Sequence, residues 1–450
     1  MDRTNPPVYT INNFSFKYPF SNANIHLSGL INIYPKSKVL LNAKSGVGKS
    51  TLLYALKGLI PKHIYGKISG EILFNGKPLT DLDRNQATQI GLLMQNPHAQ
   101  IITTTVMEEL SFGLECLGMN KEEILNRIEQ YASWFKIKHL LNKKTEELSG
   151  GEKQQINFIS IILPDPQVIL MDEPTAFLDP KSANYFIEVF NQISQDKTII
   201  IIEHNLSYLK DKVTNYLQID QSGLLYEDDV DKLNWTNKFI SSDIKSAIQP
   251  APLIEIKHYQ LKNPHKSIKD FVVNKGEIIG ILGDNGIGKT TLINSLAKLN
   301  NVAQNQVYYK GENLTTIKTK DYFEQVTLLW QNPENHFLFN RVIDEVDNQE
   351  LLKLMDLDKC LNQNPFTLSE GQKRRLSLAI VWMLNKELYL LDEPTFGQDP
   401  SNKQVLIDLI LQMQSQGKTF VIVSHDLVFL QAINAKLFYL DNEGLNDYVA

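Results

Sequence analysis

Short apolar runs that end at a charged or polar residue recur along the chain and predict buried β-strands. Four of them are residues 168–171 (VILM), 198–202 (TIIII), 388–391 (LYLL) and 420–423 (FVIV). A strand buried on both faces has such a continuous apolar pattern, whereas a half-buried strand alternates. Helical patterns lie between the runs, so the sequence predicts α/β domains with largely parallel sheets. We expect the acids and histidines after these runs to lie at the carboxyl ends of the strands, where open α/β sheets bind ligands.

Five segments of the first half recur, in the same order, in the second half. The pairs are 41–53 with 282–293, 91–97 with 327–333, 148–154 with 368–374, 168–175 with 388–395, and 200–205 with 421–426. Chance can supply one such match but not five in register, so the chain is a tandem duplication. The sequence predicts a first domain at 1–230, a polar linker at 231–252 and a second domain at 253–450.

The composition narrows the class of protein without naming a function. Hydrophobic residues make up 42% and charged residues 21%, as in globular proteins with sizeable cores. A formal net charge of −6 provides no general basic field for nucleic acid. Cys116 and Cys360 are too far apart for a zinc knuckle and too few for a disulfide scaffold. The first residues lack a signal-peptide core, and no apolar stretch reaches the ~18 residues of a spanning helix. We therefore expect a protein that does not cross a membrane by itself.

Two glycine-rich segments, residues 43–50 and 283–290, have the spacing of a phosphate-binding P-loop. Backbone N–H groups of such a loop hold phosphates, the lysine meets the β- and γ-phosphates, and the Ser or Thr hydroxyl binds Mg²⁺. Ala43 stands where the pattern has its first glycine. The candidate phosphate-binding residues are Ser45, Gly46, Gly48, Lys49, Ser50 and Thr51 in the first half, and Asn285, Gly286, Gly288, Lys289, Thr290 and Thr291 in the second.

A pair of acids closes one predicted strand in each half: Asp172 with Glu173, and Asp392 with Glu393. Adjacent carboxylates at a buried strand end repel each other unless a cation or a reaction requires both. The first acid of each pair suits Mg²⁺, and the second suits a base that orients an attacking water.

A histidine follows the next apolar run in each half, at His204 and His425. A lone histidine usually has a structural role, but its recurrence one strand after the acid pair favours a functional one. Its imidazole can contact the γ-phosphate and hold the water-orienting carboxylate. His98 and His336 lie in polar loops, and we expect no functional role for them.

The segments LSGGE at 148–152 and LSEGQ at 368–372 lie about twenty residues before the acid pairs and are far more specific than a P-loop. With them, both halves resemble the nucleotide-binding domains of ATP-binding-cassette proteins over almost the whole chain. The resemblance implies two P-loop NTPase domains, each with a mostly parallel sheet core and an inserted helical subdomain. It also implies head-to-tail packing, so that each ATP lies between one domain's P-loop and the other's signature. ATP and Mg²⁺ are the implied cofactors.

The same resemblance assigns roles to further residues. Gln95 and Gln331 are the Q-loop glutamines, near Mg²⁺ and the attacking water, and Tyr18 is the aromatic that stacks on adenine. The implied Mg²⁺-site residues are Ser50, Gln95, Asp172, Thr290, Gln331 and Asp392. The implied signature residues are Ser149, Gly150, Gly151, Ser369, Gly371 and Gln372. The departures from the family pattern are Ala43, Gln155, Asn263 in the place of Tyr18, and Glu370 in the second signature.

Residues 95–114 (QNPHAQIITTTVMEELSFGL) resemble the ATPases of energy-coupling factor and cobalt-type importers, and 331–346 is a looser copy. That resemblance implies a motor subunit at the cytoplasmic face of the membrane, with a transmembrane coupling protein and a small membrane substrate-binding protein as partners. Vitamins, their precursors or metal ions are the implied cargo. Both cassettes lie on one chain, so a homodimer is not required. The segment from Gln331 to Ser369 is shorter than that from Gln95 to Ser149, which predicts a reduced helical subdomain in the second half.

Two alternatives remain at this point. One is a soluble tandem cassette that acts on ribosomes or nucleic acid, although such proteins tend to carry a long charged linker, a cysteine-rich iron–sulfur region or a basic tail. The other is the tandem ATPase of a sugar importer, which differs mainly by lacking the segment that begins at Gln95.

Overall fold

The computed structural model describes residues 5–19, 24–43, 47–220, 222–233, 235, 239, 251–262 and 265–448. The chain divides into two compact units, Met1–Thr236 and Asn237–Ala450. Most of the predicted linker lies outside the described residues, and β12 begins at its last residue, Pro252.

The first unit contains two sheets. The six-stranded sheet has the order β11 (Leu225–Asp228), β10 (Asn215–Ile219), β4 (Lys38–Ala43), β9 (Thr198–Ile202), β8 (Val168–Asp172) and β7 (Ile90–Leu93). All neighbouring strands are parallel except β10 and β11. The antiparallel sheet has the order β2 (Asn24–His26), β1 (Tyr9–Lys17), β5 (Lys67–Phe74) and β6 (Lys77–Pro78), with β3 (Leu30–Ile33) also paired to β1. The helices are α1 (Lys49–Leu56), α2 (Arg84–Thr88), α3 (Val106–Cys116), α4 (Lys121–Trp134), α5 (Gly150–Ile162) and α6 (Pro180–Ile193).

The second unit repeats the topology of the six-stranded sheet and divides its antiparallel strands between two smaller sheets. Its six-stranded sheet has the order β19 (Val326–Leu329), β20 (Leu388–Asp392), β21 (Thr419–Val423), β16 (Ile278–Leu282), β22 (Lys436–Leu440) and β23 (Leu445–Asp447), with only β22 and β23 antiparallel. The smaller sheets hold β15 (Phe271–Asn274), β12 (Pro252–Ile256), β17 (Val307–Tyr309) and β18 (Glu312–Asn313), and the pair β13 (Tyr259–Lys262) and β14 (His265–Ile268). The helices are α7 (Lys289–Leu296), α8 (Thr319–Phe323), α9 (Val342–Glu345), α10 (Gln349–Leu354), α11 (Glu370–Met383), α12 (Pro400–Ser415) and α13 (Leu427–Ala432).

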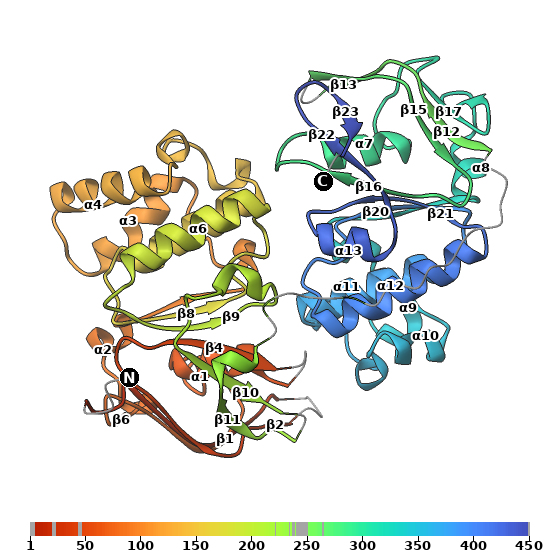
Figure 1. The fold of residues 1–450 in the computed structure, drawn as a ribbon. Helices are drawn as coiled ribbons and strands as arrows, with labels where there is room; N and C mark the ends of the chain where they lie inside the picture. The colour runs from red at the N-terminus through yellow and green to blue at the C-terminus, as the bar shows by residue number, and fades with distance from the viewer. Residues whose placement is uncertain are drawn as a thin grey trace. The chain divides into compact units, whose positions relative to one another are not determined.

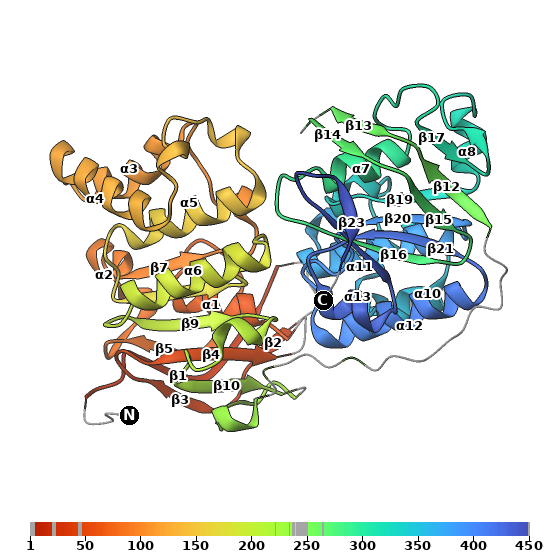
Figure 2. The same ribbon diagram turned by 45° about the horizontal axis from the view of Figure 1, so that its top comes forward.

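Alternate residues of each central strand enter two different cores. In β8, Ile169 and Met171 pack with residues of α3 to α6, whereas Val168 and Leu170 pack with α1 and the antiparallel sheet. Figures 1 and 2 accordingly show α5 and α6 over one face of the six-stranded sheet and α1 on the other. The central sheet of each unit is therefore the middle layer, buried on both faces.

The four apolar runs of the sequence are the interior of these central strands. Every residue of β8, β9, β20 and β21 is buried, and all four strands are parallel to their neighbours. The predicted α/β fold with mostly parallel sheet cores is confirmed.

The helical insertions of the two units differ in size. In the first unit α3 and α4 have 11 and 14 residues, and the side chains of Thr105 and Asn120 cap their N-termini. In the second unit α9 and α10 have 4 and 6 residues. The shorter segment after Gln331 therefore forms two short helices where the first unit has two long ones.

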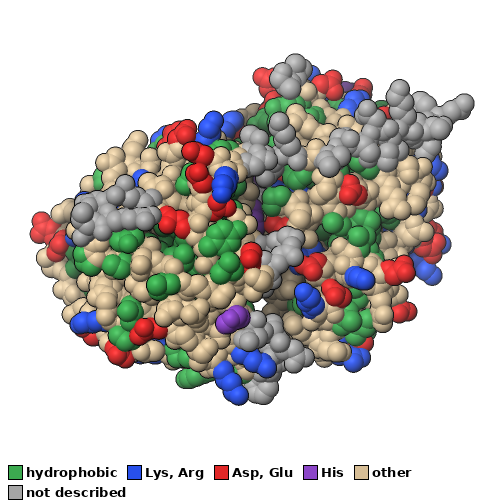
Figure 3. Space-filling model, turned by 60° about the horizontal axis from the view of Figure 1, so that its bottom comes forward, with side chains coloured by type: hydrophobic (Ala, Val, Ile, Leu, Met, Phe, Trp, Pro, Cys, Tyr) green, Lys and Arg blue, Asp and Glu red, His purple; other side chains and the backbone are tan. Residues whose placement is uncertain are grey.

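The surface of the described residues carries charges of both signs. On the face drawn in Figure 3, Lys and Arg side chains lie among Asp and Glu side chains rather than in one extended basic area. Among the described residues, no helix has both the length and the apolar character that a membrane crossing requires.

Candidate functional site

The candidate residues of the first unit meet at the carboxyl ends of three adjacent strands. The P-loop follows β4, His204 lies two residues after β9, and β8 ends at Asp172. The second unit has the same arrangement after β16, β21 and β20. Because β4, β9 and β8 are neighbours in the sheet, segments more than 120 residues apart in sequence come together at one edge.

The two P-loops have the same backbone conformation where the helix begins but different conformations where the strand ends. Gly48 and Gly288 precede α1 and α7 with φ of 110° and 108°, a region that favours glycine. Gly283 has φ 154°, and a Cβ there would lie 2.6 Å from the carbonyl oxygen of Leu440. Ala43 is instead the last residue of β4 and is not among the described residues of positive φ. The first unit therefore accepts alanine because its backbone stays in the strand at that point. Ser45 and Gly46 lie outside the described residues.

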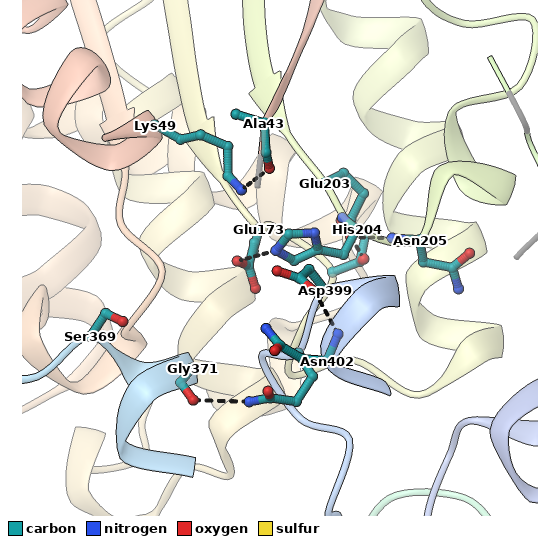
Figure 4. Close-up of polar contacts among 12 residues, drawn as sticks. Ala43, Lys49, Glu173, Glu203, His204, Asn205, Ser369, Gly371, Asp399 and Asn402 are labelled. Atoms are coloured by element: carbon teal, nitrogen blue, oxygen red, sulfur yellow. Dashed lines mark hydrogen bonds and ion pairs between the residues drawn. The ribbon is translucent and has the colours of Figure 1, made fainter. Parts of the chain in front are cut away.

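Each P-loop lysine turns back onto the start of its own loop. Lys49 Nζ donates to the carbonyl oxygen of Ala43 at 2.6 Å (Figure 4). Lys289 Nζ donates to the carbonyl oxygens of Gly283 at 2.7 Å and Asp284 at 3.0 Å. Both lysines are less than a tenth exposed. The positive charge of each lysine is therefore held next to the loop that the sequence predicts to bind phosphate.

The first acid of each pair is buried and contacts the P-loop hydroxyl residue. Asp172 is hydrogen-bonded to Ser50, and Asp392 to Thr290. Burial, followed by the adjacent glutamate, raises the pKa of Asp172 to about 7 and that of Asp392 to about 6. One carboxylate oxygen of each has no hydrogen-bond partner within the described residues. A hydroxyl and a buried carboxylate with an unpartnered oxygen fit Mg²⁺, which prefers oxygen ligands and is bound through one or two carboxylates together with substrate phosphates.

The second acid of each pair has an uncommon backbone conformation. Glu173 and Glu393 both have φ 50°, in the left-handed region. Their N–H groups donate at 2.9 Å to the carbonyl oxygens of Ile202 and Val423, at the ends of the next strands. Such conformations cost free energy and concentrate at functional sites, so the local strain supports a chemical role for the two glutamates.

The predicted histidines face these glutamates, with different geometry in the two units. His204 Nε2 lies 3.1 Å from Glu173 Oε1 (Figure 4). His425 Nε2 lies 3.5 Å from Glu393 Oε1 and 3.1 Å from Lys289 Nζ.

The pKa values of the two glutamates shift in opposite directions. Burial acts to raise the pKa of Glu173, but its polar neighbours, His204 foremost, bring it below its usual value. Burial raises the pKa of Glu393 to about 7. At neutral pH the first glutamate is therefore ionised, whereas the second is near its midpoint.

A third buried acid, Glu203, supports the histidine of the first unit. Its carboxylate accepts hydrogen bonds from the backbone N–H groups of His204 and Asn205, at 2.8 and 3.1 Å (Figure 4), and from Thr175 Oγ1 at 2.5 Å. Ser424 occupies the same place in the second unit. Because only one half has this acid, comparing the halves position by position is what draws attention to it.

The Q-loop glutamines follow β7 and β19, and a nearby side chain holds each loop. Gln95 is hydrogen-bonded to Glu173, which helps to lower the pKa of that acid. Gln100 Oε1 accepts from the N–H of Met94 at 3.0 Å, and His336 Nε2 accepts from the N–H of Trp330 at 3.1 Å. His336 thus takes the place of Gln100 and holds the Q-loop backbone, although its position in a polar loop predicted no functional role.

We predict that His336 makes the second unit sensitive to acid. Burial, followed by the charge of Arg374, lowers the pKa of His336 to about 4. In the folded unit the neutral ring accepts the hydrogen bond from the N–H of Trp330. Between pH 6.5 and 4 the unfolded chain therefore binds a proton that the folded chain does not, and the free energy of unfolding falls on acidification, by on the order of 3 kcal/mol. Urea unfolding of His336→Gln, which has the residue type of Gln100, should lack this part of the pH dependence. An unchanged pH profile would contradict the prediction.

The signature residues lie at the N-termini of α5 and α11. Ser149 and Ser369 cap these helices, each in a reciprocal pair with the residue three positions later, Glu152 and Gln372. Gly150 and Gly151 occupy the first turn of α5, and Gly371 that of α11.

The departures in the second signature have identifiable partners. Glu370 Oε1 lies 3.4 Å from Lys373 Nζ, which offsets its negative charge. Arg375, at the place of Gln155, is 3% exposed and approaches Asp356 to 3.7 Å.

The aromatic predicted to contact adenine lies beside the first P-loop helix. Tyr18 Oη is 2.9 Å from Thr51 Oγ1, and its ring packs edge-on against Phe16. In the second unit Tyr259 is buried in the core and donates to Ser295 Oγ at 2.6 Å, so its ring is not presented to a ligand. Asn263 lies outside the described residues.

The chain is similar to several known proteins. A family model described as ABC transporter matches residues 30–176 and 268–396. A Treponema denticola protein named as an ABC transporter ATP-binding protein is 30% identical, over 96% of this chain and 95% of its own length. A Bacillus subtilis protein named as an HMP/thiamine import ATP-binding protein is 28% identical, over 97% and 90%. Among solved structures, an archaeal ribosome recycling factor has a TM-score of 0.66 at 17% identity, over 97% of this chain and 90% of its own, a likeness of fold alone.

Proposed function

This chain belongs to the ABC transporter family, and we propose that it is the ATP-hydrolysing motor subunit of an energy-coupling factor type importer. The observation that carries the proposal is the duplication of a full set of side chains at the ends of adjacent strands. Each unit has a P-loop lysine and a buried aspartate that is hydrogen-bonded to the P-loop hydroxyl. Each also has a glutamate with a left-handed backbone conformation and a histidine that faces it. Membership of the family supports ATP hydrolysis with Mg²⁺. The duplicated set of side chains supports the proposal that both units hydrolyse ATP.

The side chains divide the reaction between them. Lys49 and Lys289 hold the β- and γ-phosphates. The P-loop hydroxyl and the buried aspartate of each unit would hold Mg²⁺, which would supply positive charge that offsets the charge developing on the phosphates. Glu173 and Glu393 accept a proton from the attacking water or orient it. The histidine of each unit holds that glutamate and contacts the γ-phosphate.

We further propose that each ATP is bound between the P-loop of one unit and the signature of the other, as the family resemblance implies. Because both partners are on one chain, closure is intramolecular and favoured by effective concentration. Cysteines introduced at Ser149 and Gly286, with Cys116 replaced by serine, should cross-link within one chain when ATP is present. Cross-linking only between chains would contradict this arrangement.

The membrane partners are proposed from the first unit's Q-loop segment and from the names of relatives. The segment after Gln95 resembles importer ATPases, and the similar Bacillus subtilis protein is named for import. Ile102, Phe112 and Leu125, in and around α3 and α4, are 67%, 46% and 43% exposed. Contiguous exposed apolar patches mark interaction sites, and we propose that these three side chains belong to a surface that contacts a transmembrane coupling protein. Its companion would be a small membrane protein that captures a vitamin, a vitamin precursor or a metal ion.

Co-purification from membranes tests the importer proposal against a role on ribosomes. The tagged full-length chain, extracted with mild detergent, should retain integral membrane proteins in stoichiometric amounts. Triple replacement of Ile102, Phe112 and Leu125 by serine should reduce their recovery, whereas replacing the exposed Leu224 should not. Recovery of ribosomes and no membrane protein would overturn the importer proposal in favour of a soluble tandem cassette.

A further inference from the structure

A buried arginine connects the signature helix of the second unit to its Q-loop. Arg374 lies on α11 and is 1% exposed. Its Nη1 donates to the carbonyl oxygen of Trp330 at 2.7 Å, and its Nη2 to that of Gln331 at 2.5 Å. Burial lowers the pKa of Arg374 to about 10, so the guanidinium remains charged at neutral pH. Two donors on one planar group fix two successive carbonyls in direction as well as distance.

Other contacts make the same loop rigid around this guanidinium. His336 Nε2 accepts from the N–H of Trp330, so both ends of that residue's backbone are held. Lys373, the neighbour of Arg374, forms an ion pair with Glu334 at 2.5 Å. The side chain of Gln331 is therefore presented from a backbone that α11 holds in place.

The first unit attaches its Q-loop by a different side chain. Gln154 stands where Arg374 does, is fully buried, and has no hydrogen-bond partner for its amide among the described residues. One turn later, Asn157 Nδ2 donates to the carbonyl oxygen of Pro97 at 2.8 Å. Ser377 occupies the place of Asn157 in the second unit, and its hydroxyl donates within its own helix, to Arg374 O. The two units therefore attach the Q-loop to the signature helix through different side chains.

We infer that Arg374 is the positioning residue for Gln331: by holding the carbonyl oxygens of Trp330 and Gln331, it sets where the glutamine amide lies at the second unit's nucleotide site. The inference rests on the proposed role of Gln331 in hydrolysis. A misplaced glutamine would slow the chemical step, while ATP would still be held by the P-loop. The expected signature is a loss in kcat with little change in KM.

Kinetics of the full-length chain test this, in a Glu173→Gln background that leaves only the second unit's glutamate functional. Arg374→Gln should lower kcat about 10-fold or more, with KM for ATP changed less than about threefold. The double variant Arg374→Gln with Ser377→Asn reproduces the first unit's pair and should recover most of the lost kcat, through a bond to Pro333. A kcat within about twofold of the parent in Arg374→Gln, or a folded double variant with no recovery, would overturn the inference.

Fluorescence of Trp330 provides a readout that requires neither turnover nor a membrane partner. Its contribution to acrylamide quenching is obtained as the difference between each protein and its Trp330→Phe counterpart. Quenching should increase in Arg374→Gln, increase less in Arg374→Lys, which keeps one donor group, and return toward the parent in the double variant. Unchanged quenching in Arg374→Gln would show that the arginine does not hold the loop. A chain without ATPase activity would count against the proposed function, and the quenching result would still decide this inference.

Discussion

Replacing Glu173 or Glu393 by glutamine is expected to slow hydrolysis about 100-fold or more at the nucleotide site of the unit that carries it. Glutamine keeps the size of the side chain but cannot accept a proton from the attacking water. Each glutamate is held in a strained conformation facing a histidine, 3.1 Å away in the first unit and 3.5 Å in the second. The double variant should therefore lose nearly all steady-state ATPase activity, while it still binds ATP.

The control for this experiment is Glu188→Gln, which removes the same charge from the exposed face of α6. Its ATPase activity should equal that of the wild type. If either Glu173→Gln or Glu393→Gln retained full activity, the corresponding site would not hydrolyse ATP, and the proposal of two working sites would be wrong.

Replacing Lys49 or Lys289 by alanine should weaken ATP binding at one site and leave the other unchanged. Each lysine is buried against the carbonyl oxygens at the start of its own P-loop, so it is positioned before a phosphate arrives. Loss of a charge-assisted hydrogen bond of this kind costs about 1.5–3 kcal/mol, which is about a 10- to 100-fold weaker affinity.

Equilibrium dialysis with labelled ATP should then find two sites of high affinity in the wild type and one in each lysine variant. Lys121→Ala, at the exposed start of α4, removes the same charge far along the sequence from either P-loop and should retain two. A wild-type stoichiometry that survives Lys289→Ala unchanged would contradict a functional second P-loop.

The central sheets and the positions of the catalytic candidates could be predicted from the sequence because both depend on local pattern. The run from Val168 to Met171 is apolar without interruption, and its end at Asp172 marks the carboxyl edge of the sheet. The duplication strengthens the prediction of the catalytic candidates. A motif that recurs in both halves, in the same order along the chain, is much less often accidental than a single match. The α/β fold with two cassettes followed from these observations.

Contacts between distant segments, and backbone conformation, could not be predicted in this way. The bond from Arg374 to Trp330 joins residues 44 positions apart, and nothing in either segment alone indicates it. The left-handed conformation of Glu173 is likewise invisible in a sequence, because glutamate has no preference for it. Ala43 departs from the P-loop pattern, yet the structure accommodates it because β4 extends through that residue.

Differences between the two halves of the sequence carry a further signal. His336 aligns with Gln100, and Arg374 with Gln154, when the two halves are compared position by position. In both pairs a neutral side chain in one half corresponds to a titratable or charged side chain in the other. Such differences mark positions where the two halves hold the same loop by different contacts. Both pairs lie in or against the Q-loops in the structure.

The most direct measurement of the central claim, that this chain hydrolyses ATP to power a membrane transporter, is its ATPase rate with and without the membrane proteins that co-purify with it. The chain alone and the complex reconstituted in lipid vesicles would be compared at equal chain concentration, with the Glu173→Gln and Glu393→Gln double variant as the blank. We predict a severalfold higher rate in the reconstituted complex, because a motor subunit is coupled to its partners. A rate that membrane partners leave unchanged, and that ribosomes increase instead, would contradict the account.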